Sequence, residues 1–411
     1  MNLAAGMLRP RRTRVGQLTF AVRGYIDLSL DEVDDFPTND FSTDKLPKVK
    51  FIKNRYVSPW CHDTKKSFGA VMSYLINRKR NKLKFTDIKS SVDTIPVVDV
   101  DMTTIDKYSQ EGMASFTWLG HASCYYQTNS VRFLTDPVWS DRCFPVQWLG
   151  PKRTIKPRID IDKLPIDVVL LSHTHYDHLD EGTARSIGNR ALWIVPLGVK
   201  KIVQSFGVTN CVELNWWDTY TVNTPDGRNV TIVFTPAKHW TSRSFFDRNT
   251  CLWGGFAVLS EKNKFYFAGD TAYCDVFKLI GKHLGPFDFS AIPIGAYKPR
   301  SFMKASHCDP EEAVWIHKDV QSVRSCAIHW GTFPLADEDD VEPPLELARV
   351  RQGSKVTSED FFSMAHGETV PVTSETPHSY GKMDYALNNP KLYSKYLDYH
   401  SKFFSKINSI I

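Results

Sequence analysis

The chain has 411 residues, of which 42% are hydrophobic and 24% charged, as is typical of a globular protein with one large core or two smaller ones. A net charge of +5 is too small to indicate nucleic-acid binding by itself, and no stretch approaches the roughly 20 apolar residues of a membrane-spanning helix. Eight cysteines occur singly, which favours reduced thiols in a cytosolic compartment over disulfides.

Residues 1–112 lack the strand pattern of the rest and are expected to form a basic extension that packs on or near the core. Arginines at 9, 11, 12, 14 and 23 precede the first acidic residue, Asp27. A flexible basic arm is the simpler interpretation, and a mitochondrial transit peptide is the alternative. A second basic stretch, residues 72–85, fits either an anionic membrane surface or a solvated helix face. We therefore expect a cytoplasmic protein that is peripherally associated with a membrane.

From about Gly112 onward, apolar runs rich in Val, Ile, Phe and Tyr alternate with short turns, which predicts β-strands. Two pairs of strands are expected to form hairpins: Thr117–Gln127 with Val131–Asp136, and Cys251–Ser260 with Lys264–Ala268. Helices are expected at Gly182–Ile187, Val199–Phe206 and Glu311–Lys318. Two sheet-forming halves with helices outside them predict an α/β fold over residues 113–375, an αββα sandwich of two mixed sheets packed face to face.

The most informative stretch is Ser172-His173-Thr174-His175-Tyr176-Asp177-His178, directly after the apolar run Val168–Leu171. It holds four potential metal ligands, since borderline metals such as zinc bind imidazole nitrogen and carboxylate oxygen. On an extended segment residues 173, 175 and 177 point to one side, and the following turn can bring His178 to a second metal. With only 13 histidines in the chain, a chance His-rich surface loop is the weaker explanation.

Several other apolar runs end close to a residue that could bind metal or orient a ligand, namely Asp136, His239, Asp270 and His329. Each of them alone would suit a turn or a buried structural histidine. Polar groups at the same end of neighbouring strands converge on one edge of a sheet, so we expect these residues to lie beside the His-rich motif.

Two later segments are expected to lie outside the core. Ala336–Pro344 is acidic and contains proline, which predicts a solvated loop. Residues 376–411 form a tail in which apolar residues recur every three or four positions from Leu392 to Ile410, accompanied by lysines. This pattern predicts a basic amphipathic helix that binds a membrane, docks on a partner or packs against its own domain.

The ordered set of potential ligands resembles the binuclear metal site of the metallo-β-lactamase superfamily, as do the phrases around Thr117–Ala122 and Phe133–Pro137. Between about Ser115 and Glu368, more specific phrases resemble N-acyl-phosphatidylethanolamine-hydrolysing phospholipase D. They are Gly150-Pro151-Lys152-Arg153, Trp253-Gly254-Gly255, Phe267-Ala268-Gly269-Asp270-Thr271, Ile292-Pro293-Ile294-Gly295-Ala296-Tyr297, Asp309-Pro310-Glu311-Glu312-Ala313 and Ile328-His329-Trp330-Gly331-Thr332-Phe333.

The resemblance implies a metallo-β-lactamase fold with two Zn²⁺ per chain. One zinc would be held by His173, His175 and His239, the other by Asp177, His178 and His329, with Asp270 bridging them. A water that bridges two cations loses a proton near neutral pH, so the resulting hydroxide can attack without a protein nucleophile. The implied reaction is hydrolysis of N-acyl-phosphatidylethanolamine in membranes to N-acylethanolamine and phosphatidic acid. The resemblance also suggests a homodimer.

Further residues are candidates for supporting roles. Asp136 is expected to fix a ligand imidazole from behind, with a turn-forming aspartate before Pro137 as the alternative. Asp177 and Asp270 are expected to take part in catalysis, together with His307, which would contact the phosphate or protonate the leaving alkoxide. Substrate contacts are also expected from Tyr176, Lys152 and Arg153, and Lys298 and Arg300 are candidates for pairing with phosphate. His121 is interpreted as structural.

Other functions remain open at this point. The same fold could hydrolyse a soluble lactone or phosphate ester, and such an enzyme would need no lipid-facing groove. A non-catalytic binding protein is less favoured, because all seven expected ligand positions are filled. No nucleic-acid partner is expected, since the catalytic region shows no stacking motif of the kind that binds single strands.

Overall fold

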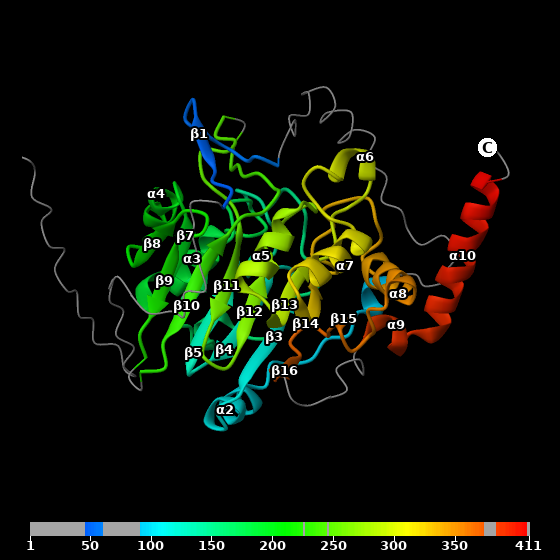
Figure 1. The fold of residues 1–411 in the computed structure, drawn as a ribbon, viewed down its shortest axis with the longest axis horizontal. Helices are drawn as coiled ribbons and strands as arrows, with labels where there is room; N and C mark the ends of the chain where they lie inside the picture. Colours follow the sequence, from blue (N-terminus) through cyan, green and yellow to red (C-terminus); the bar gives the residue numbers. More distant parts are fainter. Residues whose placement is uncertain (1–45, 61–90, 225–226, 245, 374–383, 409–411) are drawn as a thin grey trace, which may run out of the picture.

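The computed structural model describes residues 46–60, 91–224, 227–244, 246–373 and 384–408. Within these residues two seven-stranded mixed sheets pack face to face with helices outside (Figure 1), which confirms the predicted αββα sandwich. In spatial order the first sheet comprises β16 (Thr369–Val372), β3 (Ala114–Gly120), β4 (Ser123–Thr128), β5 (Val131–Thr135), β6 (Val168–Leu170), β7 (Leu192–Pro196) and β8 (Cys211–Leu214). The second comprises β15 (Phe361–Ser363), β14 (Ser322–Ile328), β13 (Phe287–Pro293), β12 (Lys264–Phe267), β11 (Gly255–Leu259), β10 (Val230–Thr235) and β9 (Thr219–Val222).

Helices and short 3₁₀ turns connect the strands. The helices are α2 (Met102–Gln110), α3 (Glu181–Ile187), α4 (Lys200–Ser205), α5 (Val276–Leu284), α6 (Arg300–Met303), α7 (Pro310–Asp319), α8 (Glu342–Ser354), α9 (Tyr385–Asn388) and α10 (Pro390–Asn408). The 3₁₀ turns are η2 (Ser91–Thr94), η3 (Ile161–Lys163) and η4 (Gly188–Arg190). A separate hairpin joins β1 (Lys50–Ile52) to β2 (Arg55–Val57). Within the described residues, no helix is both long and apolar enough to cross a membrane.

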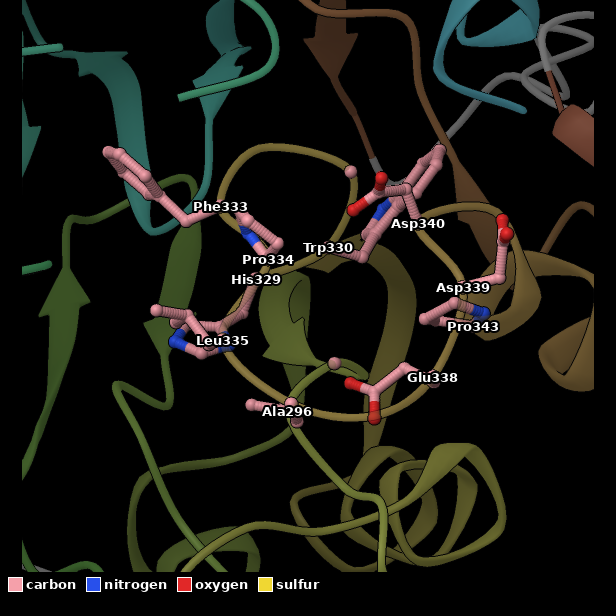
Figure 2. Close-up of a pocket in the computed structure, with 13 residues that line it drawn as sticks. Ala296, His329, Trp330, Phe333, Pro334, Leu335, Glu338, Asp339, Asp340 and Pro343 are labelled. Carbon is pink, nitrogen blue, oxygen red and sulfur yellow. The ribbon is translucent and has the colours of Figure 1, made fainter. Parts of the chain in front are cut away.

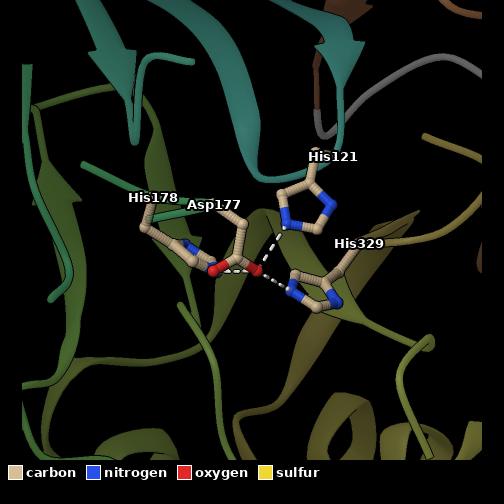
Figure 3. Close-up of side chains that lie close together, drawn as sticks. All are labelled: His121, Asp177, His178 and His329. Atoms are coloured by element: carbon tan, nitrogen blue, oxygen red, sulfur yellow. Dashed lines mark hydrogen bonds and ion pairs between the residues drawn. The ribbon is translucent and has the colours of Figure 1, made fainter. Parts of the chain in front are cut away.

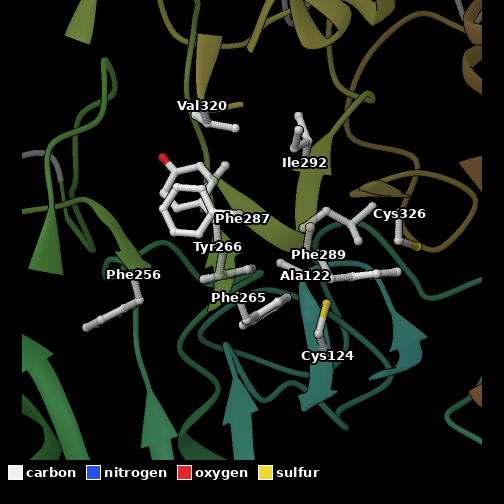
Figure 4. Packing of buried hydrophobic residues seen from close by; sticks show 14 of the residues in the cluster. Ala122, Cys124, Phe256, Phe265, Tyr266, Phe287, Phe289, Ile292, Val320 and Cys326 are labelled. Carbon is white, nitrogen blue, oxygen red and sulfur yellow. The ribbon is translucent and has the colours of Figure 1, made fainter. Parts of the chain in front are cut away.

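The hydrophobic core lies between the two sheets (Figure 4). Phe116 of β3 packs against Phe289 of β13, with ring centroids 4.7 Å apart, and Tyr126 of β4 stacks on Phe265 of β12 at 4.4 Å. These strands alternate large aromatic side chains toward the facing sheet, so each sheet buries one face of the other. The two sheets therefore form a rigid base for the loops at their edges.

One predicted strand is wrong. Thr117–Gln127 was expected to be continuous, but the chain reverses at Gly120 and His121, and β3 and β4 form a tight antiparallel hairpin. Gly120 has φ +109° and His121 has φ +53°, values outside the β region, so the strand cannot continue through them. Both predicted hairpins are present, the first as β4 with β5 and the second as β11 with β12.

The three predicted helices are present as α3, α4 and α7. The last of these begins at Pro310, where the Asp309 side chain accepts a hydrogen bond from the backbone N–H of Glu312, as expected of an aspartate cap followed by proline. In the tail, Leu392 and Tyr396 of α10 are buried, and the Tyr396 hydroxyl donates a hydrogen bond to Glu346 of α8. The first half of α10 thus packs against its own chain, while its second half runs away from the body (Figure 1).

The N-terminal arginines, the basic stretch 72–85 and the end of the tail lie outside the described residues. In the segment before β3, α2 packs against β3, β4 and β16. The domain boundaries expected at residues 112 and 375 remain predictions.

Strand direction explains why functional residues gather at one edge. β5 and β6 are parallel neighbours, as are β12, β13 and β14, and β10 runs in the same direction as β12 because two antiparallel pairings separate them. The carboxyl ends of these strands therefore reach one edge of the sandwich. There the Gly254 N–H donates a 3.1 Å hydrogen bond to the Ser172 carbonyl, which ties the two sheets together.

Candidate metal centre

A first cluster of side chains brings together His173, His175, His239 and Asp270. The Nδ1 atom of His175 lies 2.9 Å from His173 Nε2 and 3.2 Å from His239 Nε2. Asp270 Oδ2 lies 3.7 Å from His239 Nε2 and 4.0 Å from His173 Nε2. Three imidazole nitrogens thus point at one another from the loop after β6 and the segment after β10.

A second cluster contains Asp177, His178, His329 and, contrary to its interpretation as a structural residue, His121 (Figure 3). Asp177 Oδ2 lies 3.0 Å from His121 Nε2, 3.4 Å from His178 Nε2 and 3.5 Å from His329 Nε2. The reversal between β3 and β4 places His121 here. It is secured by the His329 N–H, which donates a 2.9 Å hydrogen bond to the His121 carbonyl.

Asp270 lies between the two clusters. Its Oδ2 atom is 3.2 Å from His178 Nε2, and its Oδ1 atom is 3.1 Å from His329 Nε2. The same Oδ2 atom also faces the histidines of the first cluster. The carboxylate follows Gly269, which has φ +61°. A Cβ added at this glycine would sit 2.7 Å from the Gly254 carbonyl oxygen. A side chain at position 269 would therefore push Asp270 out of place.

Hydrogen bonds from behind fix which imidazole nitrogen faces the first cluster. The Ser172 hydroxyl donates to Asp136 Oδ2 at 2.5 Å and so accepts at 2.8 Å from His173 Nδ1. His239 Nδ1 donates to the Ser306 carbonyl at 2.8 Å. When His173 and His239 are neutral, their Nε2 atoms carry lone pairs that point at His175 Nδ1. This nitrogen carries at most one proton, so it cannot donate a hydrogen bond fully to both. The His175 Nε2 atom is buried without a hydrogen-bond partner.

The two clusters differ in the pKa shifts of their histidines. Burial, reinforced by the neighbouring histidines, lowers the pKa of His173 and His175 well below the usual range, so both are neutral. Burial opposes ionisation of Asp270, but His178 and His329 outweigh it and hold the pKa of this carboxyl well below its usual range. Burial likewise lowers the pKa of His329, yet Asp270 and Asp177 raise it to about 9. The second cluster therefore requires positive charge beside its buried carboxylates.

These residues fit a pair of metal ions. Three nitrogens around a tetrahedral zinc, with Zn–N of about 2.1 Å, lie about 3.4 Å apart, close to the 2.9 and 3.2 Å seen in the first cluster. A cation would relieve the facing lone pairs there and replace protons in the second cluster. In addition, Asp270 Oδ1, His178 Nε2 and both ring nitrogens of His329 are buried without hydrogen-bond partners. The arrangement is that of a binuclear metal site.

Comparison with known proteins agrees with this geometry. A model of the β-lactamase superfamily domain matches residues 131–330. The chain is 42% identical over 297 residues to N-acyl-phosphatidylethanolamine-hydrolyzing phospholipase D 1 of Caenorhabditis elegans, a match that covers 69% of this chain and 82% of that protein. The chain belongs to the N-acyl-phosphatidylethanolamine-hydrolysing phospholipase D family, within the metallo-β-lactamase superfamily.

Two further comparisons support the assignment. The mitochondrial family member of Saccharomyces cerevisiae is 38% identical over 237 residues, covering 56% of this chain and 50% of that protein. The crystal structure of a possible metal-dependent hydrolase from Veillonella parvula matches the fold with a TM-score of 0.51 at 16% identity, covering 63% of this chain and 99% of that one. The solved structure supports the fold, while the family relationship and the two His/Asp clusters make the protein a metal-dependent hydrolase.

Asp136 lies where the sequence predicted, behind a ligand imidazole. Its Oδ2 atom accepts a 2.6 Å hydrogen bond from His178 Nδ1, and its Oδ1 atom accepts one from the Ser172 N–H at 2.7 Å. Because His178 Nδ1 is engaged by Asp136, the Nε2 atom of the same imidazole faces Asp270. Such carboxylate–histidine pairs orient the imidazole and raise its basicity as a ligand.

We predict that Asp136→Asn weakens metal binding about 10–100-fold, the usual cost of removing such a partner. The substitution keeps the shape of the side chain but removes the charge that supports His178. Metal affinity measured by competition with a chromophoric chelator checks this. Asp160→Asn is the matched control, since Asp160 is exposed and pairs with Lys163 of η3 at the surface. Equal affinities for the two variants would contradict the prediction.

The predicted substrate contacts divide into two groups. His307 reaches the metal cluster: its Nδ1 atom lies 3.8 Å from Asp270 Oδ2, and its side chain is 14% exposed. Burial lowers the pKa of His307 to about 3, so the imidazole is neutral near pH 7 and offers one donor and one acceptor. Tyr176 lies at the mouth of the site, where its hydroxyl donates to the Arg243 carbonyl at 2.9 Å.

Three of the four cationic candidates are engaged elsewhere. Arg153 is buried, and its guanidinium donates to the carbonyls of Val138, Ser140 and Ile155. We therefore correct its expected role to a structural one. Lys152 beside it is exposed, and its contact with substrate remains a prediction. Lys298 pairs with Glu342, and Arg300 with Glu312 and Asp309, so these two cations support the neighbouring loops.

The acidic segment Ala336–Pro344 is not the solvated loop that the sequence predicted. Glu338, Asp339 and Asp340 are buried and line a pocket beside His329 (Figure 2). Glu338 accepts hydrogen bonds from the backbone N–H groups of Tyr297 and Lys298, at 3.2 and 2.9 Å. The Glu338 carboxylate thus binds the backbone at Tyr297 and Lys298, beside the pocket that His329 lines.

Proposed function

We propose that this protein is a zinc-dependent phosphodiesterase that hydrolyses N-acyl-phosphatidylethanolamine to N-acylethanolamine and phosphatidic acid. The observation that carries the proposal is the pair of His/Asp clusters joined by the buried carboxylate of Asp270. The substrate is supported by the 42% identity to a C. elegans protein named for this reaction. The bond broken would be the phosphorus–oxygen bond on the ethanolamine side.

In this proposal His173, His175 and His239 hold one zinc, Asp177, His178 and His329 hold the other, and Asp270 lies between them. A zinc pair, when bound, supplies Lewis-acid stabilisation of a phosphoryl oxygen and lowers the pKa of water. The donor set of imidazole nitrogens and carboxylate oxygens suits zinc, which is therefore the metal of this proposal.

The side chains around the metals have separate tasks. His121 donates from Nε2 to Asp177 and so holds this carboxylate against the second metal position. His307, whose Nδ1 atom lies 3.8 Å from Asp270 Oδ2, has a neutral imidazole that can hydrogen-bond a phosphate oxygen of the substrate. Tyr176 would contact the substrate at the mouth. Ser306 holds His239 through its carbonyl, a contact that does not depend on its side chain.

We also propose that the protein works in the cytoplasm as a peripheral membrane protein, because the proposed substrate has two acyl chains embedded in a bilayer. A homodimer remains part of the proposal on the ground of the family resemblance.

The decisive test is turnover of N-acyl-phosphatidylethanolamine in mixed micelles by purified protein of measured zinc content, with a chelated control. We expect about two zinc ions per chain and chelator-sensitive release of both N-acylethanolamine and phosphatidic acid. Full zinc loading without lipid cleavage would refute the substrate and favour a soluble ester or lactone. Protein that binds no metal would refute the enzyme.

A further inference from the structure

The first helix of the tail, α9, is fastened to the body of the protein by buried polar contacts. Asp384, the cap of α9, forms a buried ion pair with Arg351 of α8, with a carboxylate oxygen 2.8 Å from the guanidinium. The Ser363 N–H donates to the same carboxylate at 3.4 Å, and the Ser363 hydroxyl accepts a 2.9 Å hydrogen bond from the Tyr385 N–H. Because a buried ion pair is costly to break, these contacts fix α9 beside α8 (Figure 1).

The side chain of Tyr385 is the outer end of a row of aromatic rings that leads to the second metal cluster. Tyr385 is fully buried, and its ring meets that of Trp330 edge to face, with centroids 6.0 Å apart. Trp330 stacks on Trp118 of β3 at 5.2 Å. The Trp118 indole N–H in turn donates a 3.0 Å hydrogen bond to the His121 carbonyl. The row connects α9 to two residues of the cluster, because Trp330 also directly follows His329.

The two histidines at the end of this row have backbone conformations that need support. His121 has φ +53° and His329 has φ +64°, values that a residue with a side chain keeps only when its surroundings hold it. The His121 carbonyl accepts hydrogen bonds from both the Trp118 indole and the His329 N–H, so the two residues share one support. Beneath them lies the His366 ring, 4.2 Å from that of Trp118. The packing of this row therefore fixes both backbone turns.

A second connection runs from α10 through α8 to the loop after β13. The Tyr396 hydroxyl of α10 donates a hydrogen bond to Glu346 of α8. One helical turn earlier, Glu342 accepts a 3.2 Å hydrogen bond from the Tyr297 hydroxyl. All four side chains are at least largely buried, so water does not compete strongly for these contacts. The position of α10 and the position of the loop thus depend on the same face of α8.

The loop after β13 lies directly against His329. The Ile294 N–H donates to the Ile328 carbonyl at 3.0 Å, and a Cβ added at Gly295 would sit 2.0 Å from the His329 carbonyl oxygen. Ala296 follows with φ +61°, a conformation that an alanine also keeps only when its surroundings hold it. Ala296 and His329 line the same pocket (Figure 2). A shift of this loop would therefore displace His329.

We propose that α9 and α10 position the second metal cluster, with Tyr385 and Tyr396 as the positioning residues that act through His121 and His329. The first cluster is supported from other segments, since His239 donates to the Ser306 carbonyl and His173 is bonded by the hydroxyl of the residue before it. Loosening α9 should therefore weaken the second metal position and spare the first. The inference rests on the proposed function for the pair of metals, and the identity of the substrate plays no part in it.

The test measures zinc affinity at each position separately, in the full-length protein, by competition with a chromophoric chelator. His175→Ala leaves the second cluster as the intact site, and Asp177→Ala leaves the first. In the His175→Ala background, Tyr385→Ala should raise the Kd for zinc about 10-fold, as expected when an outer support of a metal ligand is lost. In the Asp177→Ala background, the same substitution should leave the Kd unchanged.

Two further variants separate positioning from general stability. Tyr385→Phe removes only the hydroxyl, which contacts Thr94, and keeps the ring that meets Trp330, so it should restore the Kd of the parent protein. The matched control is Tyr220→Ala, because Tyr220 is a buried tyrosine of β9 at the far edge of the second sheet. This control should lower the Tm without changing either Kd.

The outcomes distinguish this inference from the proposed function. Equal loss at both metal positions, equal loss in the Tyr220→Ala control, or no loss at the second position would overturn the positioning role. If Tyr385→Ala does not fold, Tyr385→Leu fills more of the space without an aromatic ring and is judged by the same comparison. Two bound zinc ions without cleavage of N-acyl-phosphatidylethanolamine would refute the substrate and leave the positioning role standing.

Discussion

Asp270→Asn should lower turnover of the proposed phospholipid at least about 1,000-fold, the upper range for removing one stabilising group from an active site. The carboxylate faces both clusters, with Oδ2 3.7 Å from His239 Nε2 of the first and Oδ1 3.1 Å from His329 Nε2 of the second. Asparagine keeps the shape but removes the charge that would bridge two cations. Without that charge, two cations bound there would repel each other.

Turnover and metal content should be measured on the same preparation, with Asp160→Asn as the control for the loss of a carboxylate at an exposed position. Thermal unfolding separates loss of activity from loss of fold. If Asp270→Asn retained near-normal turnover with metal bound, the two-metal mechanism would be wrong.

Removing the metals should abolish activity and lower the Tm by at least ~5 °C. A ligand held at about 1,000 times its Kd contributes about 4 kcal/mol to the free energy of unfolding, and two sites contribute more. Without cations, the facing nitrogens of His173, His175 and His239 lose the charge that holds them together. Differential scanning calorimetry before and after chelation, and again after zinc is restored, gives the change directly.

The metal affinity should also depend on pH in a defined direction. Burial lowers the pKa of His329, but Asp270 and Asp177 raise it to about 9 in the metal-free protein, so a metal must displace a proton from this imidazole at neutral pH. Apparent metal affinity should therefore rise as pH increases toward 9 and fall as pH decreases.

For the thermal unfolding experiment, an unchanged Tm after complete removal of metal would contradict the stabilising role of the site.

The strand pattern could be predicted from the sequence because it depends on local order. Runs such as Val230–Thr235 consist of β-branched and aromatic residues, and their ends are marked by polar residues. The break within Thr117–Gln127 was missed because Tyr125 and Tyr126, the residues after the turn, continue the strand composition. The signal was present in Gly120-His121, where a glycine and a histidine interrupt the run.

Long-range burial decided the residues that sequence reasoning misplaced. Arg153 stands in a basic phrase, as a phosphate contact would, but the fold buries it under the carbonyls of Val138 and Ile155. Glu338 stands in an acidic, proline-containing segment, yet two N–H groups from another loop satisfy its carboxylate. The sequence shows which residues are charged, but the groups that pair with these two residues lie in other segments of the chain.

The sequence by itself determined which residues are available as ligands and that they follow strands, because residue type and strand periodicity are local properties. It thereby predicted the edge at which His173, His239, Asp270 and His329 meet. Only the tertiary structure decided that His121 joins Asp177 and that Arg153 is buried. Those placements depend on backbone reversals and on packing between segments far apart in the chain, and no local pattern encodes these distances.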